Sequence, residues 1–204
     1  MHTNDNMIVP FAGHPAANIR ATTVNYKYGL QPGTSPLVAE LAATIHATLN
    51  NCPSHALAAA AKAALRGYLC DDKLLAIAHR AGEMRDYRRH LLYADPDSQF
   101  SILAIVWQPE QRSSIHGHTT WGAMGVYEGN PYCEVFDTLA TGQTKARLNP
   151  LLKLQLKPGD LSIMQPGINE AHRIGNSSRS RCITIHIYGR DLLSRPGSIN
   201  INIS

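Results

Sequence analysis

The chain has 204 residues, of which 44% are hydrophobic and 17% are charged, and its formal net charge is +4. This composition is typical of one globular domain with its own core, and it excludes a disordered chain or a coiled coil. The small, scattered charge argues against nucleic-acid binding. Lys62 and Arg66 interrupt the most apolar stretch, 56–69, which argues against a membrane span. The opening residues lack the pattern of a signal peptide, and the four cysteines lack CxxC spacing, so we expect free thiols in a cytoplasmic protein.

The first part of the chain favours helices. Residues 1–34 have no sustained periodicity and are expected to form an N-terminal arm. A helical layer is expected over 35–84, where Ser35 can cap a helix that has Pro36 at its first position. Asp71 can cap the last helix of this layer. The three expected helices span residues 36–49, 55–69 and 73–81.

From residue 85 onward, short apolar runs alternate with turns that contain Gly, Pro, Asn or Asp. Many short strands at fairly even spacing predict an antiparallel sandwich or barrel over 85–204, sharing one core with the helical layer. The tail after Arg190 is expected to form one edge strand or a loose end. The expected strands span 90–93, 100–107, 122–127, 134–137, 151–156, 160–164 and 182–188.

Three histidines in the strand-rich part are candidate metal ligands. His116 and His118 lie two residues apart, so both imidazoles share one face of a strand. His172, in a turn-then-strand context, is the natural third ligand. A lone histidine in a strand is more often a hydrogen-bonded core or surface group. It is the spaced pair that favours a metal site here.

Two blocks of sequence resemble the paired motifs of the cupin superfamily. In the first, His116-Gly117-His118 precedes Trp121-Gly122; the second contains Gly159, Pro166, Gly167, His172 and Asn176. The resemblance implies a mainly β fold: a double-stranded β-helix barrel, jelly-roll-like, with an N-terminal helical layer. The first cupin motif usually has a Glu a few residues after its histidine pair, but residues 119–123 contain no carboxylate.

Further motifs narrow the resemblance to the thiol dioxygenases, the family of cysteine dioxygenase and 3-mercaptopropionate dioxygenase, over roughly residues 85–190. Thr184, His186 and Tyr188 alternate along one strand face and match the family's Ser-His-Tyr relay. Tyr87 and Arg89 match its Tyr-x-Arg pair, in which the arginine binds the substrate carboxylate. Two departures are Gly117 where the family usually has Asp, and the absence of cysteine in 122–124, so no Cys–Tyr crosslink is expected.

The resemblance implies that His116, His118 and His172 hold one Fe(II) per chain. It also implies that Tyr188, oriented by His186 and Thr184, contacts bound dioxygen or substrate. The implied partners are O₂ and a small carboxylate-bearing thiol, with no nucleic acid and no membrane, and the product is a sulfinic acid. L-Cysteine is the first expectation, followed by 3-mercaptopropionate and mercaptosuccinate. Two other readings stay open: a different cupin enzyme, and a non-catalytic cupin that binds a metal or small molecule.

Overall fold

The computed structural model describes residues 27–137, 150–190, 192 and 199–203. Its helical elements are α1 (Pro36–Leu49), the 3-10 helix η1 (Ser54–Ala56), α2 (Leu57–Arg66) and the 3-10 helix η2 (Ile77–Arg80). Its strands are β1 (Gly29–Leu30), β2 (Arg88–Ala94), β3 (Ser101–Trp107), β4 (His116–His118), β5 (Gly122–Glu128), β6 (Tyr132–Phe136), β7 (Pro150–Gln155), β8 (Leu161–Met164), β9 (Gly167–Gly175), β10 (Cys182–Tyr188) and β11 (Asn200–Asn202).

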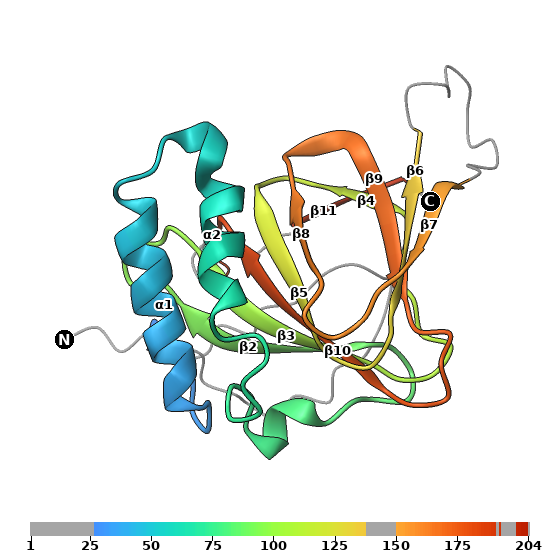
Figure 1. The fold of residues 1–204 in the computed structure, drawn as a ribbon, viewed down its shortest axis with the longest axis horizontal. Coiled ribbons are helices and arrows are strands. Elements are labelled where there is room, and N and C mark those ends of the chain that lie inside the picture. Colours follow the sequence, from blue (N-terminus) through green and yellow to red (C-terminus); the bar gives the residue numbers. More distant parts are fainter. Residues whose placement is uncertain (1–26, 138–149, 191, 193–198, 204) are drawn as a thin grey trace.

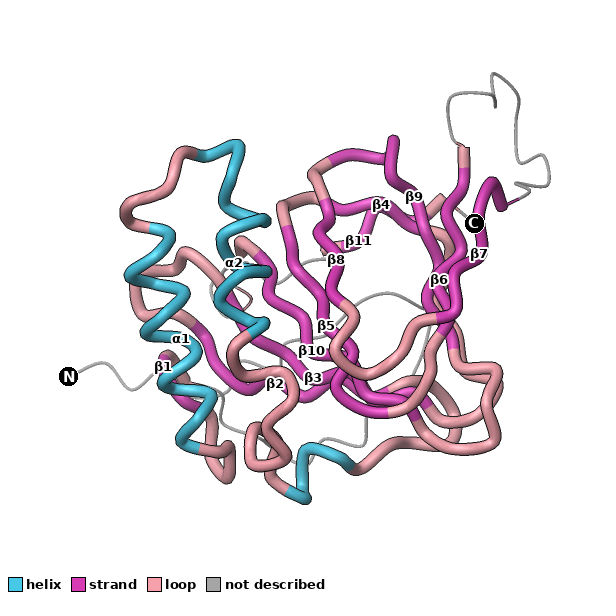
Figure 2. Tube along the Cα trace, viewed as in Figure 1, coloured by secondary structure: helices cyan, strands magenta, loops and turns pink. Residues whose placement is uncertain are grey.

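The strands form two antiparallel sheets that face each other as a barrel (Figure 2). One sheet has the order β1-β2-β3-β10-β5-β8, and the other has the order β11-β4-β9-β6-β7. With β3 counted as the first barrel strand and β10 as the eighth, the sheets read 1-8-3-6 and 2-7-4-5. This is the jelly-roll order of a double-stranded β-helix. The predicted fold class, a cupin-type barrel with a helical layer, is confirmed.

The helices α1 and α2 lie side by side against one face of the six-stranded sheet (Figure 1). Ser35 caps α1 as predicted, because its hydroxyl accepts a hydrogen bond from the backbone N–H of Leu37 at 3.3 Å. The apolar face of α1 is fully buried through Val38, Leu41 and Ile45. These residues join the barrel core in a single apolar cluster, which confirms the shared core. Barrel members of that cluster are Phe100, Ile102, Ala104, Val106, Ile183, Ile185 and Ile187.

The predicted helix over 73–81 is wrong. Asp71 does accept a hydrogen bond from the backbone N–H of Lys73 at 2.8 Å, but this bond closes only a turn. Leu74 and Leu75 are adjacent and both buried, whereas the Ile77 side chain is 87% exposed. That burial pattern has no helical period, and only the short η2 forms. The second predicted helix is found as η1 and α2, and it ends at Arg66 instead of near residue 69.

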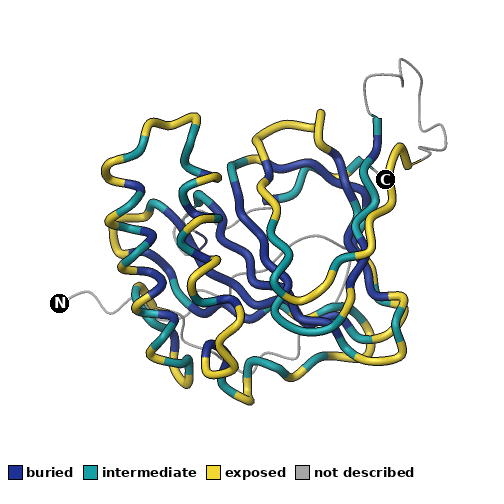
Figure 3. The backbone as a smooth tube through the Cα atoms, in the orientation of Figure 1, coloured by how far each residue is buried: buried dark blue, intermediate teal, exposed yellow. Residues whose placement is uncertain are grey.

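The first and last described strands, β1 and β11, lie at edges of the two sheets. Residues 1–26 of the predicted arm lie outside the described residues, while β1 pairs with β2. The edge-strand alternative for the tail is correct, since β11 pairs with β4. The strands β3, β4 and β10 are buried at every residue, whereas β7 is exposed along its length (Figure 3). In the described part of the chain, no helix is long and apolar enough to cross a membrane.

Candidate metal centre and adjoining pocket

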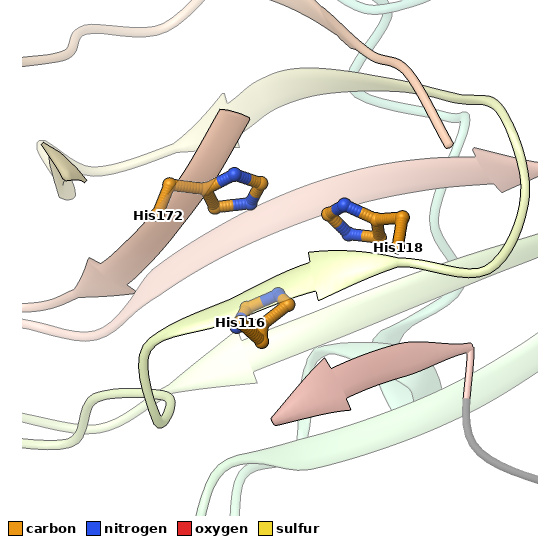
Figure 4. A group of neighbouring side chains, drawn as sticks. All are labelled: His116, His118 and His172. Atoms are coloured by element: carbon orange, nitrogen blue, oxygen red, sulfur yellow. The ribbon is translucent and has the colours of Figure 1, made fainter. Parts of the chain in front are cut away.

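Two strands of the five-stranded sheet bring the three predicted histidines together (Figure 4). His116 and His118 lie at the two ends of β4, and β9 places His172 directly opposite His116. One ring nitrogen from each of the three side chains lies within 4.8 Å of the others. All three side chains are buried. The spacing is that of a set of nitrogen ligands around one metal ion.

Hydrogen bonds define which nitrogens face the centre. Nδ1 of His116 donates to the carbonyl of Ser114 at 2.9 Å, and Nδ1 of His172 donates to the carbonyl of Glu170 at 3.0 Å. A carbonyl can only accept, so each Nδ1 carries the proton and each Nε2 keeps a lone pair. Nε2 of His118 is buried and has no hydrogen-bond partner among the described residues. A buried polar atom without a partner is costly, and a metal ion at this point would satisfy all three nitrogens.

Electrostatics keep these ligands neutral. Burial, assisted by the proximity of His172, lowers the pKa of His116 to about 4 and that of His118 to about 2. Burial also lowers the pKa of His172. The three imidazole rings therefore carry no charge near neutral pH. Three neutral imidazoles are a donor set that suits Fe, Zn, Cu or Ni, and they leave the ion its full positive charge.

The close approach of β9 explains why a glycine separates the two histidines of β4. A Cβ atom on Gly117 would lie 2.1 Å from the carbonyl oxygen of Gly167 and 2.9 Å from Cα of Ile168. The β4–β9 register is irregular here, since His116 pairs with His172 while His118 pairs with Gly167. An Asp, the usual residue at this position in thiol dioxygenases, would not fit this backbone.

A series of hydrogen-bonded side chains lies along β10. Tyr188 and His186 interact through the tyrosine hydroxyl and Nδ1 at 2.9 Å, and Thr184 Oγ1 lies 2.8 Å from Nε2 of His186. Trp107 of β3, which the sequence analysis did not select, extends the series by donating its indole N–H to Thr184 Oγ1 at 2.9 Å. The rings of Tyr188 and His118 stack with centroids 5.9 Å apart. The series therefore ends beside the histidine triad.

Burial sets the protonation states along this series. It lowers the pKa of His186 to about 3, with a smaller contribution from the positive charge of Arg89. It raises the pKa of Tyr188, although the positive charge of Arg89 opposes the shift. Near neutral pH, His186 therefore carries a single N–H and Tyr188 keeps its proton.

Arg89 reaches the same site from β2 in the other sheet. Its Nη2 donates to the hydroxyl of Tyr87 at 2.5 Å, and its guanidinium carbon lies 4.5 Å from the centre of the Tyr87 ring. The Tyr87 ring stacks in turn on Trp107 with centroids 4.4 Å apart. Within the described part of the chain, Arg89 makes no ion pair. Its charge is therefore available to an anionic ligand.

One pocket, partly open to solvent, connects these groups. None of the described residues that line it is acidic. The predicted residues that line it are Tyr87, Arg89, His116, His172, His186 and Tyr188. His118 completes the triad, and Thr184 lies behind His186. The lining residues that the sequence analysis did not select are Ile105, Trp107, Ser113, Ile174, Ile199 and Asn200. The inward alternation of Ile105 and Trp107 along β3 is the only sequence signal for any of them.

A second group of potential ligands lies outside this pocket. His46 of α1 places Nδ1 3.2 Å from Asp95 and Nε2 3.4 Å from Asp97. Each ring nitrogen already faces a carboxylate. The group is thus a side-chain contact that ties α1 to the turn after β2.

The fold has counterparts among solved structures, although no family model matches the chain. These counterparts are double-stranded β-helix proteins of the cupin type. One is an uncharacterised conserved protein with a double-stranded β-helix domain from Klebsiella pneumoniae: 14% identity, TM-score 0.47, covering 66% of this chain and 99% of that one.

Two further structures are similar. A cupin 2 conserved barrel domain protein from Salinispora arenicola has 16% identity and a TM-score of 0.39, covering 53% of this chain and 88% of that one. Oxalate decarboxylase from Lactobacillus farciminis has 16% identity and a TM-score of 0.42, covering 59% of this chain and 32% of that one.

Proposed function

We propose that the protein is a non-haem Fe(II) thiol dioxygenase. It adds both atoms of O₂ to the sulfur of a small thiol that bears a carboxylate, and the product is a sulfinic acid. L-Cysteine is the first candidate substrate, 3-mercaptopropionate the second and mercaptosuccinate the third. The observation that carries the proposal is the pocket itself, in which a triad of neutral histidines lies beside an arginine that makes no ion pair in the described chain.

His116, His118 and His172 would hold the iron through their Nε2 atoms. When bound, ferrous iron supplies the redox chemistry that joins O₂ to the substrate sulfur. The carbonyls of Ser114 and Glu170 fix the orientation of two of the three rings. Such hydrogen bonds to ligand histidines typically hold the ring and increase its basicity.

Arg89 would bind the substrate carboxylate. Tyr87 holds one amino group of the guanidinium and supports its face, so the remaining N–H groups can be directed at the pocket. A carboxylate placed there meets a positive charge, and none of the described lining residues is acidic. The substrate sulfur is then held at a fixed distance from its carboxylate, which positions it relative to the triad.

Tyr188 would donate a hydrogen bond into the pocket. Because the Trp107 indole can only donate, the Thr184 hydroxyl accepts from it. The Thr184 O–H can then donate a hydrogen bond to Nε2 of His186. His186 then donates from Nδ1 to the oxygen of Tyr188, and the Tyr188 O–H is free to donate onward. The reverse direction would leave the fully buried Thr184 hydroxyl proton without an acceptor among the described residues, at a cost of about 1–3 kcal/mol.

The test is oxygen consumption by protein reconstituted anaerobically with Fe(II). The substrates are cysteine, 3-mercaptopropionate, mercaptosuccinate and cysteamine, which has no carboxylate. Sulfinate is identified by mass spectrometry with isotopically labelled O₂. At least one carboxylate-bearing thiol should be oxidised, with both labelled atoms in the product. Iron binding without oxygen consumption by any thiol would instead favour the non-catalytic cupin.

A matched pair of arginine variants tests the carboxylate contact. Arg89→Ala should lower kcat/KM for the carboxylate-bearing thiols by about 10- to 100-fold, as expected for the loss of a charge-assisted hydrogen bond. Cysteamine should be little affected. Arg88→Ala is the control, because Arg88 precedes Arg89 on β2, is exposed and lies outside the pocket lining. Equal losses for cysteine and cysteamine would mean that Arg89 has only a structural role.

A further inference from the structure

The last described strand, β11, adds to the edge of the strand that carries the histidine pair. Its ladder pairs Asn200 with His118, Ile201 with Gly117 and Asn202 with His116. Backbone hydrogen bonds extend the pairing at both ends: the N–H of Thr119 donates to Ile199, and the N–H of Ile203 donates to Ile115, each at 2.9 Å. The position of β11 relative to the triad is therefore fixed by a continuous ladder.

The register places Asn200 on the inward face of the sheet. Residues directly opposite each other in an antiparallel pair direct their side chains to the same face, with Cβ atoms about 4.5–5.5 Å apart. His118 directs its ring into the barrel, toward the other two histidines (Figure 4). Asn200 is its partner and lines the pocket. The side chain of Asn200 therefore lies on the pocket side of β11.

Ile199 lines the same pocket and is 6% exposed. It belongs to the apolar cluster that also contains Ile105, Trp107 and Tyr188, so it forms part of the packed wall. Arg89 reaches the pocket from β2, in the opposite sheet. A small molecule in the pocket would thus lie between the Arg89 guanidinium, from one sheet, and Ile199 and Asn200, at the edge of the other sheet.

We propose that Asn200 and Ile199 determine substrate specificity by contacting the substituent on the carbon chain between the thiol and the Arg89-bound carboxylate. This inference rests on the proposed function. A carboxamide both donates and accepts, so Asn200 recognises a polar substituent such as the amino group of cysteine or the second carboxylate of mercaptosuccinate. None of the described residues that line the pocket has a carboxylate that could take over the contact to an amine. Ile199 limits the size of that substituent.

The first test replaces Asn200 by a residue of similar size that cannot form hydrogen bonds. Asn200→Leu should lower kcat/KM for cysteine or mercaptosuccinate about tenfold relative to 3-mercaptopropionate, which carries only hydrogen at this position. Dissociation constants measured anaerobically by calorimetry on the Fe(II) protein should change in the same ratio. Asn202→Leu is the matched control: it lies on the same strand but is exposed and outside the pocket lining, bonded to Ser114.

The second test changes the size of the wall. Ile199→Ala should shift the preference several-fold toward the bulkier mercaptosuccinate. Ile201→Ala should not, because Ile201 lies opposite Gly117 and does not line the pocket. The variant ratios distinguish this inference from the proposed function. If the wild type oxidises thiols and Asn200→Leu affects all of them equally, or no more than Asn202→Leu does, the specificity role is wrong while the function stands. If no thiol binds or is oxidised, both are wrong.

Discussion

The contact between β4 and β9 at Gly117 makes a sharp test of the centre. Replacing Gly117 by Ala adds one methyl group on the strand that carries the histidine pair. That methyl carbon would lie 2.1 Å from the carbonyl oxygen of Gly167, and backbone atoms cannot turn aside as a flexible side chain can. Either β9 moves away from β4 or the pairing breaks. Since His172 lies on β9 opposite His116, either response spreads the triad.

The size of the effect follows from that distance. Overpacking a tightly packed site by one methyl group costs about 1–3 kcal/mol. For a chain of this size each kcal/mol changes Tm by about 2–4 °C, so we expect a drop of about 2–12 °C. The separation of the ligands should also reduce the bound metal well below one ion per chain. Gly117→Asp should be at least as damaging, because it adds a charge to the same methylene.

The assay is differential scanning calorimetry of the metal-free protein together with metal analysis after reconstitution. Gly67→Ala is the control, since a Cβ at the end of α2 would lie at an ordinary 3.7 Å from Ala64 and Gly67 already has helical backbone angles. That variant should be neutral or slightly stabilised. Wild-type Tm and metal content in Gly117→Ala would refute the described approach of β9 to β4.

Three other predictions concern the pocket. His116→Ala should lose most of the bound iron, whereas His55→Ala, at an exposed position, should keep it; full occupancy in both would remove His116 from the centre. Tyr188→Phe should lower kcat by about 10²-fold at unchanged iron content. Trp107→Phe should lower kcat less, again without iron loss, and unchanged turnover in both would exclude the relay. Because burial lowers the pKa of His186 from 6.5 to about 3 and that of His116 to about 4, only the unfolded chain takes up their protons just below pH 6.5. The free energy of unfolding of the metal-free protein should therefore decrease as the pH falls from 6.5 toward 4. Between about pH 7 and pH 5, we expect a loss of about 2 kcal/mol per ring. A free energy of unfolding in urea that stays constant over this range would contradict the neutral rings.

The positions of the central strands were predictable because the barrel buries those strands along their whole length. β3 and β10 are buried at every residue, and such runs stand out against the turns between them. The strand β9 was not predicted, since its first four residues are exposed and only the later part is apolar. The helix predicted over 73–81 depended on Asp71 as its cap, but Leu74 and Leu75 are adjacent and both buried, and the backbone there forms turns. Local pattern was reliable wherever burial was periodic or continuous.

The site was predictable where it depends on spacing within one strand. The pair on β4 and the alternating series on β10 follow from the two-residue period of a strand. The role of Trp107 and the position of Asn200 depend on which strands pair and in which register. Trp107 is 77 residues away from Thr184 in the sequence, and no local pattern encodes that contact.

Gly117 shows how the two kinds of information combine. From the sequence, a glycine in place of the usual Asp is only a departure from the pattern of the thiol dioxygenases. In the structure it is a requirement, because the bulged part of β9 occupies the space where any side chain would begin. The support comes from elsewhere: from carbonyls of the chain next to two ligand histidines, and from the β11 ladder on the outer edge of β4. The strand that carries the histidine pair is thus held on both edges by backbone.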